Sequence, residues 1–162
     1  MVVSENQIWQ WLEDVSDPEI PVLSVVDLGV VRHVDLSHDH PIVHITPTYS
    51  GCPAMNEIEE NIKLKLKEEG LENAEVQTIL SPPWTTDWMT ERGKEKLREY
   101  GIAPPEGSSA DKSVLFGKAK TVKCPNCGST NTDMVSQFGS TACKALYKCS
   151  DCLEPFDYFK CI

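Results

Sequence analysis

Two short cysteine motifs decide how the last part of this 162-residue chain folds: Cys124-Pro125-Asn126-Cys127 and Cys149-Ser150-Asp151-Cys152. Each motif holds two cysteines with two residues between them, and 21 residues separate the motifs. A C-x2-C turn lets two thiolates point at one ion, and a β-hairpin between the motifs brings the second pair round to complete a tetrahedron. The spacing therefore predicts a structural zinc site with these four cysteines as ligands, in a β zinc ribbon over residues 119–162.

The alternative is that these thiols are free or form disulfides. The chain has seven cysteines, an odd number, and no secretory segment with a basic start and an apolar centre. In a reducing compartment, paired C-x2-C motifs are typical of metal binding rather than of disulfides. Cys143 and Cys161 lie near the motifs, so which four cysteines bind the metal stays open at this point. A module of about forty residues buries little apolar surface, so metal binding supplies its folding free energy.

The charge of the chain is uneven. The net charge is −10, and residues 1–118 hold ten Lys and Arg against 21 Asp and Glu, whereas residues 119–162 hold five against four. Such an acidic surface repels phosphate backbones, so we expect no nucleic-acid partner. No run of about 18 apolar residues occurs, so we expect a soluble, cytoplasmic protein with no membrane association.

The first hundred residues alternate helical and strand-like patterns. Ser4 and Gln7 have the form of a capping box, and the apolar residues after them recur at helical spacing, which predicts a helix over residues 5–15. Apolar runs then predict one strand ending at residue 36 and another over residues 42–46, antiparallel across the turn between them.

Three further elements complete this part. Pro53 at a first helical position predicts a helix over residues 54–69. Residues 74–79 predict a third strand, and Thr90 caps a third helix that ends at Tyr100. The order α-β-β-α-β-α predicts a small α+β domain with a three-stranded sheet covered by helices.

We therefore expect an α+β domain over residues 1–102, a linker over 103–118 and the zinc ribbon over 119–162. The linker is rich in Pro, Gly and Ser. Inside the ribbon, strand-like residues lie on both sides of Gly139, and the aromatic stretch Pro155-Phe156-Asp157-Tyr158-Phe159 predicts a last strand.

Three histidines, His38, His40 and His44, lie in and beside the first hairpin. No cysteine or carboxylate stands near them at ligand spacing, so we interpret them as turn and surface groups rather than metal ligands.

Cys52 is the residue outside the ribbon that is best suited to chemistry. The predicted helix places it at the N-cap, where unpaired backbone N–H groups and the helix dipole favour a thiolate. The alternative is a small buried side chain that caps a helix without reacting. The chain has no Ser/His/Asp order, no phosphate-binding glycine loop and no H-E-x-x-H motif, so nothing indicates an independent catalyst.

The acidic loop Asp17-Pro18-Glu19-Ile20-Pro21 is extended because two prolines bracket it. From spacing alone, it is an ordinary turn whose acids are solvated.

Four short motifs together resemble a known family: Asp17-Pro18-Glu19, Asp27-Leu28-Gly29, Gly51-Cys52-Pro53 and Pro83-Trp84. Their order is similar to that in the SufT-like family of small cytosolic iron–sulfur assembly proteins, over about the first hundred residues. The resemblance implies that Cys52, with Asp17 and Glu19 in the acidic loop, takes part in cluster transfer. The stretch Pro47-Thr48-Tyr49-Ser50 departs from the family, since it is longer and bulkier than the loop usual before this cysteine.

With the ribbon and its stretches 138–141 and 143–147, the whole chain resembles the PaaD family, the D subunits of the bacterial phenylacetyl-CoA epoxidase system in aerobic phenylacetate degradation. This resemblance implies an accessory role: assisting the assembly of an iron–sulfur cluster or another metal centre, in the iron–sulfur reductase component. It also implies the other epoxidase subunits as partners, and a transient iron–sulfur cluster beside the structural zinc.

Two other functions are alternatives. The chain could be a structural or regulatory subunit of the epoxidase complex, in which Cys52 is inert and the ribbon is a docking module. It could also be the oxygenase itself, but the paired Glu-x-x-His motifs of a di-iron bundle are absent from the sequence.

Overall fold

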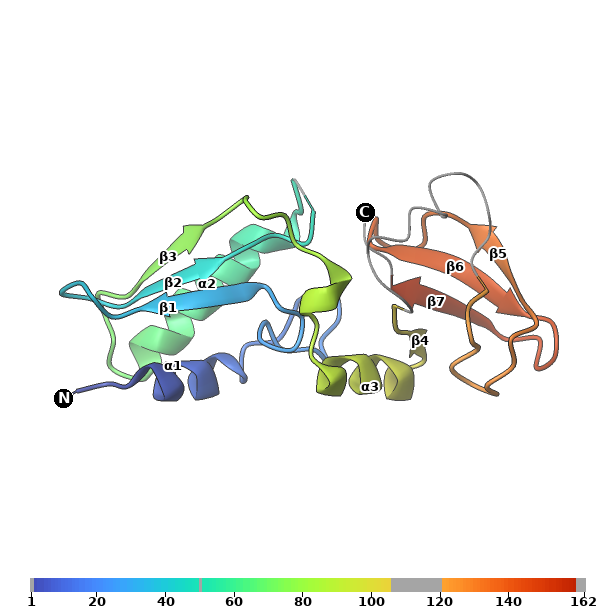
Figure 1. The fold of residues 1–162 in the computed structure, drawn as a ribbon, viewed down its shortest axis with the longest axis horizontal. Coiled ribbons are helices and arrows are strands. Elements are labelled where there is room, and N and C mark those ends of the chain that lie inside the picture. Colours follow the sequence, from blue (N-terminus) through green and yellow to red (C-terminus); the bar gives the residue numbers. More distant parts are fainter. Residues whose placement is uncertain (1, 50, 106–120, 160–162) are drawn as a thin grey trace. The chain divides into compact units, whose positions relative to one another are not determined.

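The computed structural model describes residues 2–49, 51–105 and 121–159 (Figure 1). The chain divides into two compact units. Unit 1 consists of Met1–Trp84 and Trp88–Gly93, and unit 2 of Thr85–Asp87 and Lys94–Ile162. The fold is α+β, with a helix-covered sheet in unit 1 and a β region at the C-terminal end, as the sequence predicts.

The sheet of unit 1 has three strands in the order β1-β2-β3. Strands β1 (Val31–Asp35) and β2 (Ile42–Ile45) form the predicted antiparallel hairpin, in which Val34 lies opposite Val43. Strand β3 (Glu75–Thr78) pairs parallel to β2. A parallel pair needs a crossover, and the helix between β2 and β3 supplies it.

Two helices pack in this unit, α1 (Glu5–Leu12) and α2 (Ala54–Glu68). The capping box is present, since Ser4 accepts the N–H of Gln7 and the Gln7 side chain accepts the N–H of Ser4. Helix α1 ends three residues before the predicted end at residue 15, because the chain turns at Glu13 and Asp14.

The core of unit 1 forms where the apolar faces of both helices meet the sheet and the loop before β1. Burying such side chains contributes about 1.5–3 kcal/mol each before the entropy of ordering the chain is counted. The fully buried members include Ile8, Leu12, Leu23, Val25, Val30, Val43, Ile45, Ile58, Ile62 and Leu66.

A 3-10 turn, η1 (Thr86–Trp88), precedes helix α3 (Glu91–Tyr100). The N–H of Gly93 donates to Thr90 Oγ1 at 2.9 Å, which confirms Thr90 as the cap of this helix. Gly101 follows the helix with a φ of +90°, a left-handed conformation that ends helices.

The sheet of unit 2 has four strands in the order β4-β7-β6-β5. Strands β5 (Thr132–Ser136), β6 (Lys144–Cys149) and β7 (Pro155–Phe159) form an antiparallel meander. Strand β5 ends before Gly139, so the strand expected next to that glycine lies a few residues earlier. The last strand is confirmed over the aromatic stretch.

The short strand β4 (Ile102–Ala103) was not predicted. It pairs parallel to β7, with Ile102 opposite Asp157 and Ala103 opposite Tyr158. Ala103, the first residue of the predicted linker, is therefore part of a sheet. Most of the rest of that linker lies outside the described residues. The boundaries at 102 and 119 stay a prediction.

The core of the ribbon is small. Tyr147 stacks on Phe156 with ring centroids 5.8 Å apart and meets Tyr158 edge-on at 5.7 Å. The buried cluster also includes two of the motif cysteines; its members are Ala103, Val122, Cys124, Ala145, Tyr147, Cys149, Phe156 and Tyr158. None of the helices in the described ranges is both long enough and apolar enough to cross a membrane.

Candidate functional site

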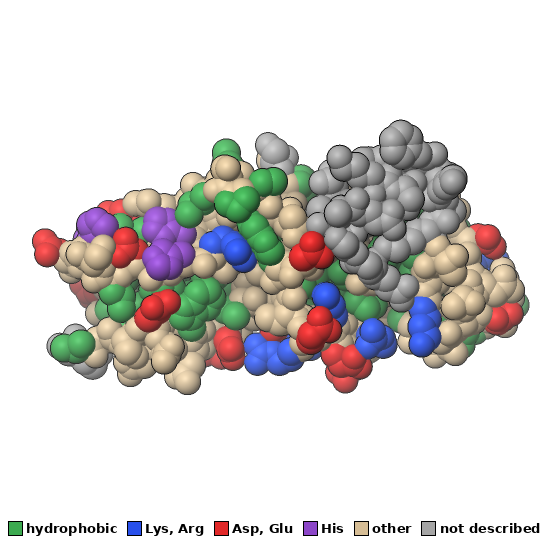
Figure 2. Space-filling view, in the orientation of Figure 1, with side chains coloured by type: hydrophobic (Ala, Val, Ile, Leu, Met, Phe, Trp, Pro, Cys, Tyr) green, Lys and Arg blue, Asp and Glu red, His purple; other side chains and the backbone are tan. Residues whose placement is uncertain are grey.

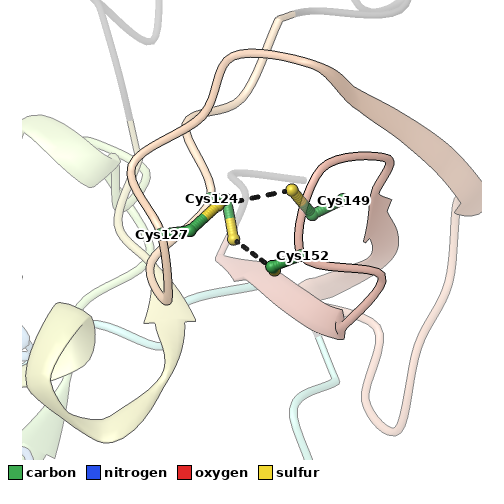
Figure 3. Close-up of side chains that lie close together, drawn as sticks. All are labelled: Cys124, Cys127, Cys149 and Cys152. Carbon is green, nitrogen blue, oxygen red and sulfur yellow. Dashed lines mark hydrogen bonds between the residues drawn. The ribbon is translucent and has the colours of Figure 1, made fainter.

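The four cysteines of the two motifs converge on one point (Figure 3). Their sulfur atoms all lie within 4.8 Å of one another. Across the motifs, Cys127 Sγ lies 3.5 Å from Cys149 Sγ, and Cys124 Sγ lies 3.8 Å from Cys152 Sγ. Zn–S bonds of about 2.3 Å at tetrahedral angles place sulfurs about 3.8 Å apart, so these positions match the ligand shell of a single ion.

Each pair of cysteines sits on a tight turn, which we call the first knuckle (residues 124–128) and the second knuckle (149–153). In the first knuckle, the N–H of Gly128 donates to Cys124 O at 2.9 Å. In the second, the N–H of Cys149 donates to Glu154 O at 3.0 Å. The residue after each second cysteine is left-handed: Gly128 has a φ of +77° and Leu153 a φ of 65°.

Backbone N–H groups of the knuckles donate to the sulfur atoms. The N–H of Cys152 is the main cause that lowers the pKa of Cys149 to about 7, and the N–H of Asp151 adds to it. Such bonds favour thiolates, which are the form that binds a metal.

Crowding of the thiols acts in the opposite direction at Cys152. The N–H of Glu154 donates to its sulfur and lowers its pKa, but burial and the three neighbouring thiols together raise the pKa of Cys152 to about 12. Four thiolates this close repel one another, so a cation is needed to hold them deprotonated together. The donor set of four soft sulfurs at tetrahedral spacing fits zinc.

The other two ribbon cysteines do not join this group in the described structure. Cys143 is buried, and its sulfur lies 3.0 Å from Thr141 Oγ1. Cys161 lies outside the described residues. Within the part of the chain that the structure describes, the four motif cysteines are the one group of three or more potential ligands.

Cys52 does not cap helix α2, so this expectation was wrong. Pro53 is the N-cap, with φ −67° and ψ −23°, and no side chain caps the helix. Cys52 lies one residue farther out, in a turn where its N–H donates to Tyr49 O at 3.2 Å. Its half-buried thiol accepts a long hydrogen bond of 3.9 Å from Thr48 Oγ1. The helix boundary differs by one residue because proline already holds helical φ at the cap.

Asp17 has a structural role in the acidic loop. Its Oδ1 accepts the N–H groups of Glu19 and Ile20, both at 2.8 Å, and only 6% of the residue is exposed. The solvated turn expected from spacing is therefore wrong for Asp17, because the tight loop leaves two N–H groups that its carboxylate satisfies. Glu19 is half-buried.

The topology brings the loops of these residues to one end of the sheet. Cys52 follows β2, and residues 79–85 follow β3, which is parallel to β2, so both loops leave the same edge. Strand β1 begins at that edge because it is antiparallel to β2. The acidic loop lies just before β1, where Ser16 bridges Ser24. Cys52, Asp17 and Glu19 share this end without forming a ligand group among the described residues.

The motif Asp27-Leu28-Gly29 holds the segment that leads into α3. Buried Asp27 Oδ1 accepts Thr90 Oγ1 at 3.1 Å and Arg92 Nε at 2.9 Å. Trp84 Nε1 donates to Leu28 O at 2.9 Å. Sequence reasoning did not find this network, because its members lie some sixty positions apart.

A side chain at position 29 would collide with the carbonyl of Trp88, and Gly29 has a φ of +77°, so this residue must be glycine. Arg32 lies over the Trp88 ring at 3.5 Å from its centroid.

The histidines gather over β1 and β2 (Figure 2). His38 lies 3.5 Å from Asp35, and His40 lies 3.1 Å from Glu75. His44 is half-buried within β2 and stacks on His33 with ring centroids 5.7 Å apart, so it belongs to a strand rather than to a turn.

Two family models match the chain in separate regions. The model described as "Iron-sulfur cluster assembly protein" matches residues 5–80, and the one described as "PaaD zinc beta ribbon domain" matches residues 108–160.

Relatives and solved structures agree with this division. A Porphyromonas gingivalis protein named Fe-S protein maturation auxiliary factor is 35% identical, over 61% of this chain and 92% of its own length. A crystal structure of a domain of unknown function, DUF59, from Bacillus anthracis is 31% identical, with a TM-score of 0.53 over 57% of this chain and 90% of that domain.

One relative matches almost throughout. An Escherichia coli (strain K12) protein, named as a D subunit of 1,2-phenylacetyl-CoA epoxidase, is 48% identical over 157 residues, which are 97% of this chain and 93% of that protein. The chain has the assembly-type region and the ribbon in the same order. It belongs to the PaaD family, the D subunits of phenylacetyl-CoA epoxidase.

Proposed function

We propose that the protein is an accessory factor of the phenylacetyl-CoA epoxidase system that assists iron–sulfur cluster assembly in the reductase component. The observation that carries this proposal is the combination in one chain of a region similar to maturation factors and a ribbon of the PaaD type. Its partners are then the other epoxidase subunits, and its place is the cytoplasm.

In this proposal the ribbon cysteines Cys124, Cys127, Cys149 and Cys152 hold a structural zinc ion. The sulfur spacing and the N–H groups that donate to the sulfurs support this assignment. The ion would supply the cross-link that a core of eight small and aromatic residues cannot replace.

Cys52 is the proposed residue for cluster transfer. A single thiolate binds a cluster weakly and releases it again, whereas four thiolates retain their metal. Its thiol is half-buried, and it follows Gly51, whose φ of +78° keeps the turn tight and where an added Cβ would meet open space. Asp17 supports the neighbouring loop through its backbone bonds, and Glu19 is the remaining acid there.

The charge distribution suits a protein client. Unit 1 residues 1–84 carry four Lys and Arg against 15 Asp and Glu, a difference of −11. Such a surface is attracted to a basic patch on a client and speeds its encounter.

A strain that lacks this gene and carries Cys52→Ser tests the proposal. We expect the other subunits to associate as before while the purified reductase loses most of its iron. Cys143→Ser is the matched control, since Cys143 is buried and lies outside the sulfur group. Full iron content with Cys52→Ser would refute the transfer role.

The second candidate is a structural or regulatory subunit without a transfer role. It is favoured by the position of Cys52 outside the helix cap and by the structural use of Asp17. In that case Cys52→Ser leaves the reductase iron unchanged, whereas loss of a ribbon ligand disrupts the complex.

A further inference from the structure

One carboxylate of the second knuckle bonds to residues that follow the first. Asp151 Oδ2 accepts the hydroxyl of Ser129, and Asp151 Oδ1 accepts Asn131 Nδ2 at 3.3 Å. Ser129 Oγ in turn accepts the N–H of Asn131 at 3.0 Å. We call these three residues, Ser129, Asn131 and Asp151, the inter-knuckle bridge.

The backbone of the same residues contacts the ligand sulfurs. The N–H of Ser129 donates to Cys127 Sγ, and the N–H of Asp151 donates to Cys149 Sγ. These two sulfurs belong to different knuckles and lie 3.5 Å apart. A bond between the side chains of Ser129 and Asp151 therefore ties together the two N–H donors that flank this sulfur pair.

The bridge is also fixed from the backbone. The N–H of Ser150 donates to Asn131 O at 2.8 Å, and the N–H of Cys124 donates to Ser129 O at 2.8 Å. The hydroxyl of Ser129 lowers the pKa of Asp151, and Asn131 adds to this effect, so the carboxylate is ionised and accepts charge-assisted bonds.

We propose that the inter-knuckle bridge is a positioning device that holds the two knuckles at metal-binding spacing and so slows the loss of the ion. Outer hydrogen bonds that orient ligands change metal affinity by about 10-fold to 100-fold in other sites. The inference rests on the proposed metal site, and it is independent of the cluster-assembly role.

Ser129→Ala is the decisive variant because it removes the hydroxyl without changing any charge. It thereby separates the bridge from the general attraction between a carboxylate and a cation. Ser129→Thr keeps a hydroxyl and should restore the bond. Asp151→Ala removes both acceptors and should have the larger effect.

Ser150→Ala is the matched control. Ser150 is exposed and lies next to Asp151, but its hydroxyl donates to Asp133 Oδ2 of β5, at 3.4 Å, rather than to the first knuckle. Its backbone bond to Asn131 survives the substitution.

The measurement is the rate at which zinc passes from the full-length protein to an excess of a chromophoric chelator. We expect release about 10-fold faster for Ser129→Ala and faster still for Asp151→Ala, with Ser129→Thr and Ser150→Ala near the wild type. Cobalt-substituted protein checks that each variant still forms a tetrahedral four-sulfur site. Equal rates for Ser129→Ala and wild type would overturn the bridge, as would an equal acceleration in Ser150→Ala. A wild-type protein that binds no zinc would overturn the metal site itself, and the bridge with it.

Discussion

Unit 1 and the ribbon reach a folded state by different means. Unit 1 buries long aliphatic side chains from two helices, a sheet and a loop, such as Leu12, Ile45 and Ile62. The ribbon buries eight residues around three aromatic rings, and two of the eight are metal-binding cysteines. The comparison teaches that apolar burial stabilises one part of this chain, whereas the other depends on sulfur–metal bonds.

The largest effect should follow from breaking the metal site. We expect Cys149→Ser, or removal of zinc by a chelator, to unfold residues 121–159 while unit 1 stays folded, since structural zinc contributes on the order of 10 kcal/mol. Amide NMR spectra would show loss of dispersion for the ribbon alone. Cys143→Ser should retain one zinc per chain. A ribbon that stays folded without metal would contradict the comparison.

The next effect concerns unit 1, which should be sensitive to its buried polar network. Asp27→Ala leaves Thr90 and Arg92 without their acceptor, and we expect the free energy of unfolding to fall by about 2–3 kcal/mol. This is below the usual cost for a buried ion pair because Arg92 is half-exposed. Chemical denaturation measures the change, and zinc content should not alter.

Glu13→Gln is the control for Asp27→Ala. Glu13 pairs with the same arginine at 3.4 Å but lies at the surface, where ion pairs contribute little. A loss of stability as large as that of Asp27→Ala would show that Arg92, rather than the buried carboxylate, is the important group.

The smallest effect compares the two knuckles. Leu153 has a φ of 65° where Gly128 has +77°, and 66% of Leu153 is exposed, so its side chain gains little from burial. We expect Leu153→Gly to stabilise the zinc-bound ribbon by up to about 1 kcal/mol and Gly128→Ala to destabilise it by about 1 kcal/mol. Thermal unfolding in excess zinc measures both changes. If Leu153→Gly destabilises the ribbon, the left-handed strain is not what limits this turn.

Local signals in the sequence predicted much of this fold. The capping box of Ser4 and Gln7, the first hairpin and the cap at Thr90 depend on neighbouring residues, and all three are confirmed. The paired cysteines were predicted as ligands from their spacing, and the structure brings their sulfurs together.

Features that depend on distant residues could not be read in this way. Strand β4 has two residues, too few for a periodic pattern, and its partner β7 lies more than fifty positions later. The Ser129–Asp151 bond needs both knuckles to be folded before it exists. The cap of α2 was misplaced because Cys52-Pro53 fits two helix starts that differ by one residue.

The pairing of β4 with β7 has a consequence for the order in which the chain folds during synthesis. The sheet of unit 1 is complete once Thr78 has left the ribosome, because its three strands are close in sequence. Strand β4 must wait for Pro155–Phe159, and the ion must wait for Cys152, before either finds its partner. We therefore expect nascent chains to carry a folded unit 1 well before they acquire zinc.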